Sequence, residues 1–279
     1  MSKQNLNTEK LSTTENEKFP VDCLVGLPPL QLNEIYNGDS FELCKRVPAK
    51  TVDLILEDMP YNTTACEWDI KIDLELYWKT RLRILKPTGA IVLTATQPFT
   101  TDLIMTNRDM FRYEWVWEKE RGQNFIQAKK QPLRAHEMIL VFYKKFGIYN
   151  PQMQDAPEKN IRKPQRHTKH KSEVYGLGKM PAIDYDETKR YPKTILKYSS
   201  GRARDKEHPT QKPVGLFEYL IRTYSNEGDL VFDGFGGSGT TAVACHKSKR
   251  NFIVIEKEQK YFDLATRRLD NERRQLSLL

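Results

Sequence analysis

The sequence predicts an α/β fold with a doubly wound, mostly parallel sheet, and three observations support this prediction. Short apolar runs alternate along the chain with longer segments of helical periodicity. A glycine-rich turn at residues 234–239 joins one apolar run to a helical segment. Residues 147–207 follow neither periodicity and separate two regular parts of the chain. We therefore expect one core of seven strands, built from both ends of the chain, with an insert between them.

The residues before the insert, 31–146, supply the first half of this core. Residues 52–58 form an apolar run that ends in two carboxylates and a proline turn, which is typical of the carboxyl end of a parallel strand. A helix is expected at 74–85, and Pro87 and Gly89 are expected to end it. Asp39 is either a helix N-cap or the border of a ligand site. Further strands are expected at residues 34–36, 90–94, 111–117 and 138–143.

The residues after the insert, 208–279, complete the core. The sequence from Pro213 onwards predicts an amphipathic helix, because four apolar residues recur there at helical spacing: Leu216, Phe217, Leu220 and Ile221. A strand at 229–233 leads into the glycine-rich turn and a helix from about Thr240. A strand at 251–256 and a charged helix from about Gln259 follow.

The composition indicates a polar protein of a reducing compartment. Hydrophobic residues make up 38% of the chain, the mean hydropathy is −0.68, and no apolar run approaches the roughly 20 residues that a membrane helix needs. The first 20 residues lack the apolar region of a secretory signal, and the four cysteines form no CxxC pair. We expect a cytoplasmic protein without a zinc site or a disulfide framework, in which residues 1–30 form a flexible tail.

The insert is strongly basic, in a chain whose net charge is +8. Its densest part is residues 159–171, and a polyanion such as a nucleic acid would be attracted there. Charge alone supports a solvated surface loop equally well. If the insert binds nucleic acid, the candidate contacts are Arg162, Lys163, Arg166, His167, Lys169, Arg202 and Arg204.

The glycine-rich turn indicates a cofactor that contains adenosine. Gly234, Gly236 and Gly239 match G-x-G-x-x-G between a strand and a helix, and glycine lets the backbone approach a ligand closely. Glu256 ends the next strand about 20 residues on, where a carboxylate can accept hydrogen bonds from ribose hydroxyls. A P-loop is disfavoured, because Thr240 stands where that motif needs lysine. A purely structural turn is the remaining alternative.

Residues 58–61 (Asp-Met-Pro-Tyr) suit a planar base that carries an amino group. The Asp58 carboxylate and the Met59 carbonyl can accept its two N–H bonds, and the Tyr61 ring can stack on the base. The four residues alone are also compatible with an ordinary turn.

Three segments together resemble the β class of amino-directed DNA methyltransferases. Residues 58–61 resemble the (D/N/S)PP(Y/F) motif, residues 233–241 resemble the cofactor motif, and residues 208–213 (HPTQKP) resemble the segment that precedes it. The resemblance covers residues 33–268 apart from the insert. It implies a Rossmann-like S-adenosylmethionine-dependent methyltransferase fold in permuted motif order, with residues 31–146 as catalytic half, 147–207 as target recognition region and 208–279 as cofactor-binding half.

The resemblance also implies roles for single residues. Asp58, Met59, Pro60 and Tyr61 would form the catalytic motif. The cofactor S-adenosylmethionine would contact Asp233, Phe235, Gly236 and Ser238 at its methionine end and Glu256 at its ribose, while Thr210 and Lys212 precede a helix whose N-terminus could receive its carboxylate. Two residues depart from the pattern: Met59 and Gly234 stand where the family often has proline. Neither change predicts a loss of activity, although Gly234 is expected to loosen its turn.

The implied reaction is methylation of a flipped-out base in a specific sequence of double-stranded DNA, as in restriction–modification systems. Asp rather than Ser at position 58 favours adenine N6 over cytosine N4. Methylation of cytosine C5 is excluded, because it uses a cysteine that follows proline, and none of the four cysteines does. A homodimer is compatible with the resemblance. The alternatives are an RNA methyltransferase, a non-catalytic DNA-binding protein, and a dehydrogenase, which would leave residues 58–61 unexplained.

Overall fold

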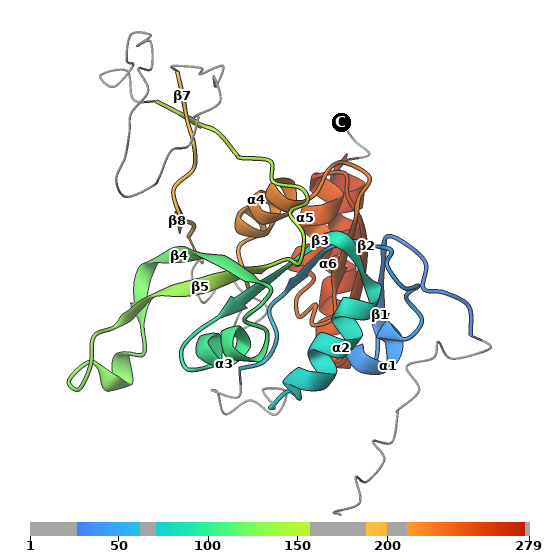
Figure 1. Cartoon of the computed structure of the whole chain (residues 1–279), viewed down its shortest axis with the longest axis horizontal. Helices are drawn as coiled ribbons and strands as arrows, with labels where there is room; N and C mark the ends of the chain where they lie inside the picture. Colours follow the sequence, from blue (N-terminus) through green and yellow to red (C-terminus); the bar gives the residue numbers. More distant parts are fainter. Residues whose placement is uncertain (1–26, 62–70, 157–187, 200–210, 277–279) are drawn as a thin grey trace, which may run out of the picture.

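The computed structural model describes residues 27–61, 71–156, 188–199 and 211–276 (Figure 1). The helices are α1 (Ser40–Cys44), α2 (Leu74–Ile84), α3 (Phe99–Thr106), α4 (Val214–Tyr224), α5 (Thr240–Lys247) and α6 (Gln259–Leu276), with a short 3₁₀ turn η1 (Phe125–Gln127). The strands are β1 (Glu34–Asn37), β2 (Val52–Glu57), β3 (Leu85–Ala95), β4 (Phe111–Gln123), β5 (Arg134–Phe142), β6 (Gln154–Asp155), β7 (Lys189–Arg190), β8 (Ile195–Lys197), β9 (Leu230–Asp233) and β10 (Asn251–Glu256).

The central sheet has the strand order β1-β10-β9-β2-β3-β5-β4-β8. Strand β5 runs antiparallel to both of its neighbours, and every other described pairing in this sheet is parallel. The predicted α/β class is therefore confirmed, and the seven predicted strands are all present. Strand β8 is an eighth that the sequence analysis missed, since its three residues lie within the irregular stretch 147–207.

The start of β3 differs from the prediction. Helix α2 ends at Ile84, and β3 begins at once at Leu85, so that Pro87 and Gly89 lie inside the strand. The register against β2 shifts at this point, because Val52 pairs with Leu85 whereas Leu54 pairs with Ala90. The proline and the glycine occupy this irregular stretch, where neither interrupts a regular ladder. Helix α3 was also not predicted.

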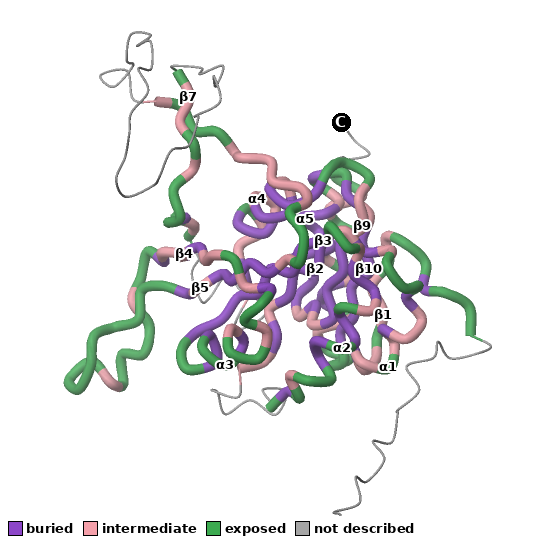
Figure 2. The backbone as a smooth tube through the Cα atoms, in the orientation of Figure 1, coloured by how far each residue is buried: buried purple, intermediate pink, exposed green. Residues whose placement is uncertain are grey.

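Two layers of helices cover the sheet and bury alternate strand residues on opposite faces (Figure 2). On β2, Ile55 packs among residues of α2, and its neighbours Leu54 and Leu56 pack among residues of α4 and α5. Trp115 and Trp117 of β4 belong to the second face and are core residues. Within the described ranges, no helix combines the length and apolar character needed to cross a membrane.

The parallel pairing of β2, β9 and β10 brings the ends of three strands to one edge of the sheet. Asp58 follows β2, Asp233 ends β9, and Glu256 ends β10. Strands β2 and β9 come from opposite sides of the insert in sequence, yet they are neighbours in the sheet. Ligands of open α/β sheets bind at such an edge, where the order of connections changes.

We expect Gly239→Ala to destabilise the protein more than Gly228→Ala. Both glycines have positive φ, +76° and +84° respectively, so alanine is strained by about 1–2 kcal/mol at either site. A Cβ at Gly239 would also lie 2.7 Å from the Ala265 Cβ, whereas a Cβ at Gly228 would meet nothing within 4 Å. Overpacking adds about 1–3 kcal/mol. Urea unfolding of both variants measures the difference, and equal losses would contradict the described packing of α6 on this loop.

Candidate active site

The Asp58 carboxylate is the centre of a polar cluster at the carboxyl end of β2. Its Oδ1 accepts hydrogen bonds from the Tyr61 hydroxyl at 2.6 Å and from the Thr94 hydroxyl. Its Oδ2 accepts from the Lys212 ammonium at 2.5 Å, across 154 residues of sequence. The Asp58 side chain is 21% exposed and Lys212 is 7% exposed, so Asp58 is the reachable member of the pair.

Four side chains of alternating charge extend this cluster. Lys212 also lies 3.4 Å from Glu137 Oε2, and the other oxygen of Glu137 accepts from Lys119. Burial disfavours the charged form of Lys212, but the Asp58 and Glu137 carboxylates outweigh it and raise the pKa of that ammonium. Burial lowers the pKa of Lys119. Lys212 therefore carries a fixed positive charge beside Asp58.

The residues next to Asp58 have contrasting environments. The Tyr61 ring lies 5.5 Å from the Phe99 ring and is half-buried. Burial and the nearby Asp58 carboxylate raise the pKa of the Tyr61 hydroxyl well above its ordinary value, so it stays a hydrogen-bond donor. The Met59 side chain is in the core, and no described N–H or O–H group donates to its backbone carbonyl. Pro60 is half-buried and precedes the ring.

The glycine-rich loop is held by two acidic side chains. Asp233 accepts from the Phe235 amide at 2.9 Å and from the Thr241 hydroxyl, and Glu256 accepts from the Gly237 amide at 2.7 Å. Gly236 donates to the Ile255 carbonyl at 2.8 Å, and a side chain at this position would overlap with Val254. Ser238 accepts from Arg268 at 2.8 Å.

Burial also disfavours the charged forms of the Asp233 and Glu256 carboxyl groups. Burial and the neighbouring Glu57 raise the pKa of Asp233 to about 8, and burial raises that of Glu256. A carboxylate can accept about four hydrogen bonds, and Asp233 accepts two within the described chain, whereas Glu256 accepts from backbone amides of residues 237, 257 and 258. An ammonium group near Asp233 and hydroxyl groups near Glu256 would fill the remaining sites. The loop thus fits an adenosine cofactor with an amino-acid tail.

Beneath the loop lies a buried ion pair that the sequence analysis missed. Glu57 Oε1 accepts from Arg81 Nε and from the Gly234 amide, both at 2.9 Å, and Oε2 accepts from the Tyr77 hydroxyl at 2.5 Å. The Arg81 side chain is fully buried and also donates to Ser40. A Cβ at Gly234 would overlap with Ser40 and Arg81. The expectation that Gly234 loosens its turn is therefore wrong, because its amide is bonded and its surroundings are filled.

The remaining predicted residues are placed as follows. Lys212 lies against the Asp58 carboxylate, and its role in holding a cofactor carboxylate stays a prediction. Asp39 is the N-cap of α1, where it accepts from the Phe41 and Glu42 amides. The other predicted contacts lie outside the described residues: Thr210 of the cofactor set, and Arg162, Lys163, Arg166, His167, Lys169, Arg202 and Arg204 of the basic insert.

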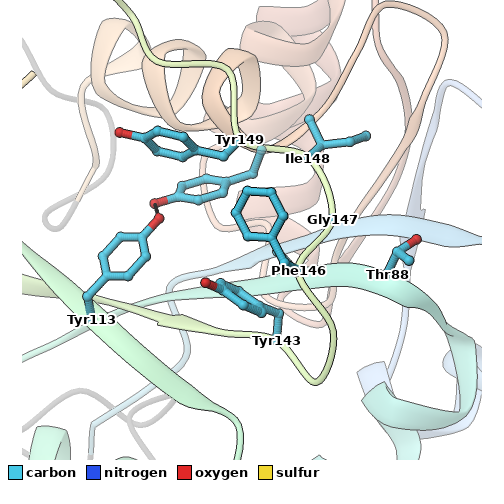
Figure 3. Close-up of a pocket in the computed structure, with 9 residues that line it drawn as sticks. Thr88, Tyr113, Tyr143, Phe146, Gly147, Ile148 and Tyr149 are labelled. Carbon is cyan, nitrogen blue, oxygen red and sulfur yellow. Dashed lines mark hydrogen bonds between the residues drawn. The ribbon is translucent and has the colours of Figure 1, made fainter. Parts of the chain in front are cut away.

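A small aromatic pocket elsewhere does not resemble a catalytic site. It is lined by Thr88, Ala90, Tyr113, Tyr143, Phe146, Gly147, Ile148, Tyr149 and Tyr224 (Figure 3). It lies beside the first part of β3, whereas the Asp58 cluster is at the opposite end of the parallel strands. Its lining carries no acidic or basic side chain, and two of its hydroxyls, those of Tyr113 and Tyr224, bond to each other at 3.0 Å.

Comparison with known proteins now decides the family. Residues 52–267 match the family model N6_N4_Mtase, described as DNA methylase. The chain belongs to this DNA methylase family. The match to the family model runs from β2 into α6 and includes both the Asp58 cluster and the glycine-rich loop, so the predicted resemblance is confirmed. Membership also removes the dehydrogenase alternative. The methyl donor of the family is S-adenosylmethionine, the predicted cofactor.

Individual relatives agree with this assignment. The methylase is 29% identical to the type II methyltransferase M.BglII of Bacillus subtilis over 279 residues, covering 92% of this chain and 74% of the relative. It is 31% identical to the DNA adenine methyltransferase YhdJ of Escherichia coli (strain K12) over 254 residues, covering 85% and 82%. The crystal structure of the M1.HpyAVI–SAM complex has the same fold, with a TM-score of 0.59 at 23% identity over 85% of this chain and 98% of that one.

Removing one partner of the buried ion pair is expected to be strongly destabilising. Arg81→Met leaves the Glu57 charge buried, and losses of about 3–5 kcal/mol are typical of such changes. The double variant Glu57→Gln/Arg81→Met should recover part of this loss, because no charge is left behind. Urea unfolding gives the values. Lys45→Met, in a largely exposed pair with Glu42, is the control and should cost at most about 1 kcal/mol. An equally small loss for Arg81→Met would contradict the described burial.

The pKa of Asp233 predicts how stability depends on pH. With a pKa of about 8 when folded and 3.8 as its ordinary value, this carboxyl holds a proton in the folded protein that the unfolded chain releases between about pH 4 and pH 8. This contribution to stability is complete below pH 4 and is lost as the pH rises through 8. Asp233→Asn should therefore flatten the pH dependence of the unfolding free energy in this window. An unchanged slope in urea titrations at several pH values would argue against the raised pKa.

Proposed function

We propose that this DNA methylase methylates the N6 amino group of adenine in a specific sequence of double-stranded DNA. The observation that supports it most is the Asp58 carboxylate, which lies at the carboxyl edge of the sheet, partly exposed, with the glycine-rich loop on the neighbouring strand. An exocyclic amino group needs acceptors for its two N–H bonds, and Asp58 and the Met59 carbonyl supply them. The target base must first leave the helical stack to reach this edge.

The two carboxylate oxygens of Asp58 have different hydrogen-bond partners and different proposed roles. Oδ1 already accepts from Tyr61 and Thr94, which hold the carboxylate in one orientation. Oδ2 has only Lys212 as a described partner, so it retains capacity for one N–H of the base. Tyr61, whose hydroxyl is bonded to Asp58, presents its ring as the surface on which the base stacks. The reaction therefore depends on positioning and hydrogen bonding rather than on a covalent enzyme intermediate.

The cofactor is held by the predicted residues of the loop. Asp233, Phe235, Gly236 and Ser238 are proposed at the methionine end, Glu256 at the ribose hydroxyls, and Thr210 with Lys212 near the carboxylate. The raised pKa of Asp233 supports an ammonium partner, since a cation nearby would restore the charged form. Bound S-adenosylmethionine supplies an electrophilic methyl group. The amino nitrogen would take this methyl from the sulfonium, which would become a neutral thioether, and would release one proton to water.

The choice of adenine rests on Asp at position 58 and on similarity to YhdJ, which is named a DNA adenine methyltransferase. The family model is named for both N6 and N4 methylation, so cytosine N4 is the second candidate. The proposal has four further parts: residues 147–207 recognise the target sequence, the substrate is a DNA duplex, the protein acts in the cytoplasm, and it forms a homodimer. Similarity to the two relatives from Bacillus subtilis and Escherichia coli supports action in a bacterial cytoplasm.

The decisive experiment identifies the methylated nucleoside. Unmethylated genomic DNA is incubated with the protein and labelled S-adenosylmethionine, digested, and examined by mass spectrometry. We expect N6-methyladenine, and we expect Asp58→Asn to lower the rate about 10²- to 10³-fold, because one accepting oxygen and the charge are lost. Asp109→Asn is the control, since that carboxylate is exposed, lies outside residues 147–207, and precedes β4 at the sheet edge opposite Asp58.

Other products would redirect the proposal. N4-methylcytosine would keep the mechanism and replace the target base. Label in RNA but not in DNA would change the substrate class. No transfer to either polymer, with the cofactor bound, would favour a non-catalytic DNA-binding protein. Full activity of Asp58→Asn would remove Asp58 from the mechanism.

A further inference from the structure

The strands β4 and β5 continue past the rest of the sheet as a two-stranded arm, residues 118–136. Strand β5 pairs with β3 only as far as Met138 opposite Ala95, whereas β4 and β5 stay paired out to Gln123 opposite Arg134. Leu93 of β3 is level with Glu57 of β2, so the arm leaves at the edge that carries Asp58. Figure 1 shows the arm projecting from the body of the molecule.

The arm carries positive charge that nothing described neutralises. Residues 121–136 contain no Asp or Glu, and four exposed basic side chains lie among them: Arg121, Lys129, Lys130 and Arg134. None of the four forms an ion pair with a described carboxylate. The segment also holds exposed amide side chains, which can donate to phosphates and read base edges. This composition favours a nucleic acid over a protein partner.

The tip of the arm is apolar. Phe125 and Ile126 are the first two residues of the 3₁₀ turn η1, and their side chains are 67% and 95% exposed. The six residue steps from Glu118 to Asn124 span about 20 Å, which exceeds the depth of either DNA groove, about 8 Å. Apolar side chains at the end of a basic element are the means by which several proteins unstack DNA bases. A target base that leaves the stack creates such a gap.

The base of the arm is connected to the catalytic carboxylate. Lys119, at the start of the arm, bonds to Glu137, which pairs with Lys212, which bonds to Asp58. Burial of Lys119 and Lys212 makes this connection rigid in comparison with an exposed pair. The direction of the arm is thereby set relative to the group that receives the base.

We propose that the arm is a DNA-contacting element, in which Phe125 and Ile126 insert into the base stack beside the target base and the four basic residues contact phosphates. This inference rests on the proposed methylation of DNA. It assigns to residues 118–136 a contact separate from the recognition region predicted at 147–207. Unstacking the target base costs free energy, and burying two apolar side chains that are exposed in the free protein would offset that cost.

The test uses the full chain and two variants, Phe125→Ala/Ile126→Ala and the quadruple change of Arg121, Lys129, Lys130 and Arg134 to Gln. Leu82→Ala is the matched control, because Leu82 is 40% exposed near the end of α2 that adjoins the start of β3, away from the Asp58 edge. The target sequence is first located from the positions that the wild-type protein methylates. Duplexes with the target base paired or mismatched are then compared.

We expect Phe125→Ala/Ile126→Ala to lower kcat/KM on the paired duplex at least tenfold, with near wild-type activity on the mismatched duplex, where the base leaves the stack easily. S-adenosylmethionine affinity, measured by calorimetry, should not change. The quadruple variant should reduce the slope of log K against log salt on any duplex by about 3 to 4, at about 0.9 per lost phosphate contact.

Two results would overturn the inference. In one, the wild-type protein methylates DNA and both variants behave as Leu82→Ala does. In the other, the variants change the oligomeric state in sedimentation but leave DNA binding intact, which would make the arm an interface between copies of the chain. If the wild-type protein methylates no DNA, the proposed function fails instead, and the salt slope alone decides whether the arm binds DNA.

Discussion

The Glu57 carboxylate accepts hydrogen bonds from three groups on two elements of the chain, at a site with no exposure to solvent. Arg81 approaches from α2, Tyr77 from the same helix one turn earlier, and the Gly234 amide from the loop after β9, 177 residues away. A buried charge must be compensated this completely, or the fold becomes unstable. The two halves of the core, on either side of the insert, are therefore held together beneath the cofactor loop.

The position of the site follows from this constraint. Asp58 is the next residue after Glu57, and Asp233 is the residue before Gly234, so fixing Glu57 against Gly234 also fixes the two acidic side chains to which we assign roles in the proposed reaction. Lys212 then joins Asp58 to Glu137 of β5. Because the site is buried, each charge in it needs a partner of opposite sign. Opposite charges alternate from Lys119 to Asp58. Asp233 has no described cation as a partner, and its pKa is raised instead.

The sequence predicted the strands and both motifs because their signals are local, whereas the ion pairs join residues far apart. The sequence does indicate that Arg81 is buried, because it lies at helical spacing from Tyr77 and Ile84 on the apolar stripe of α2. A buried charge at such a position needs a partner of opposite charge. The partner itself could not be read from one sequence. Pro87 and Gly89 misled the prediction of β3, because both are helix-ending and turn-forming residues that here occupy an irregular part of a strand.

The direction of β5 explains why the arm and the start of the insert leave the sheet at opposite edges. Because β5 is antiparallel, the connection before it projects at the Asp58 edge, and its end delivers the chain to the opposite edge. There Asn150 bonds to the carbonyls of Arg222 and Ser225 near the end of α4. Strand β8 runs parallel to β4 and so carries the chain back toward the Asp58 edge, where Lys212 meets Asp58. One reversed strand thus allows a long insertion without displacing the Asp58 carboxylate, because Asn150 near its start and Lys212 after its end are bonded to the core.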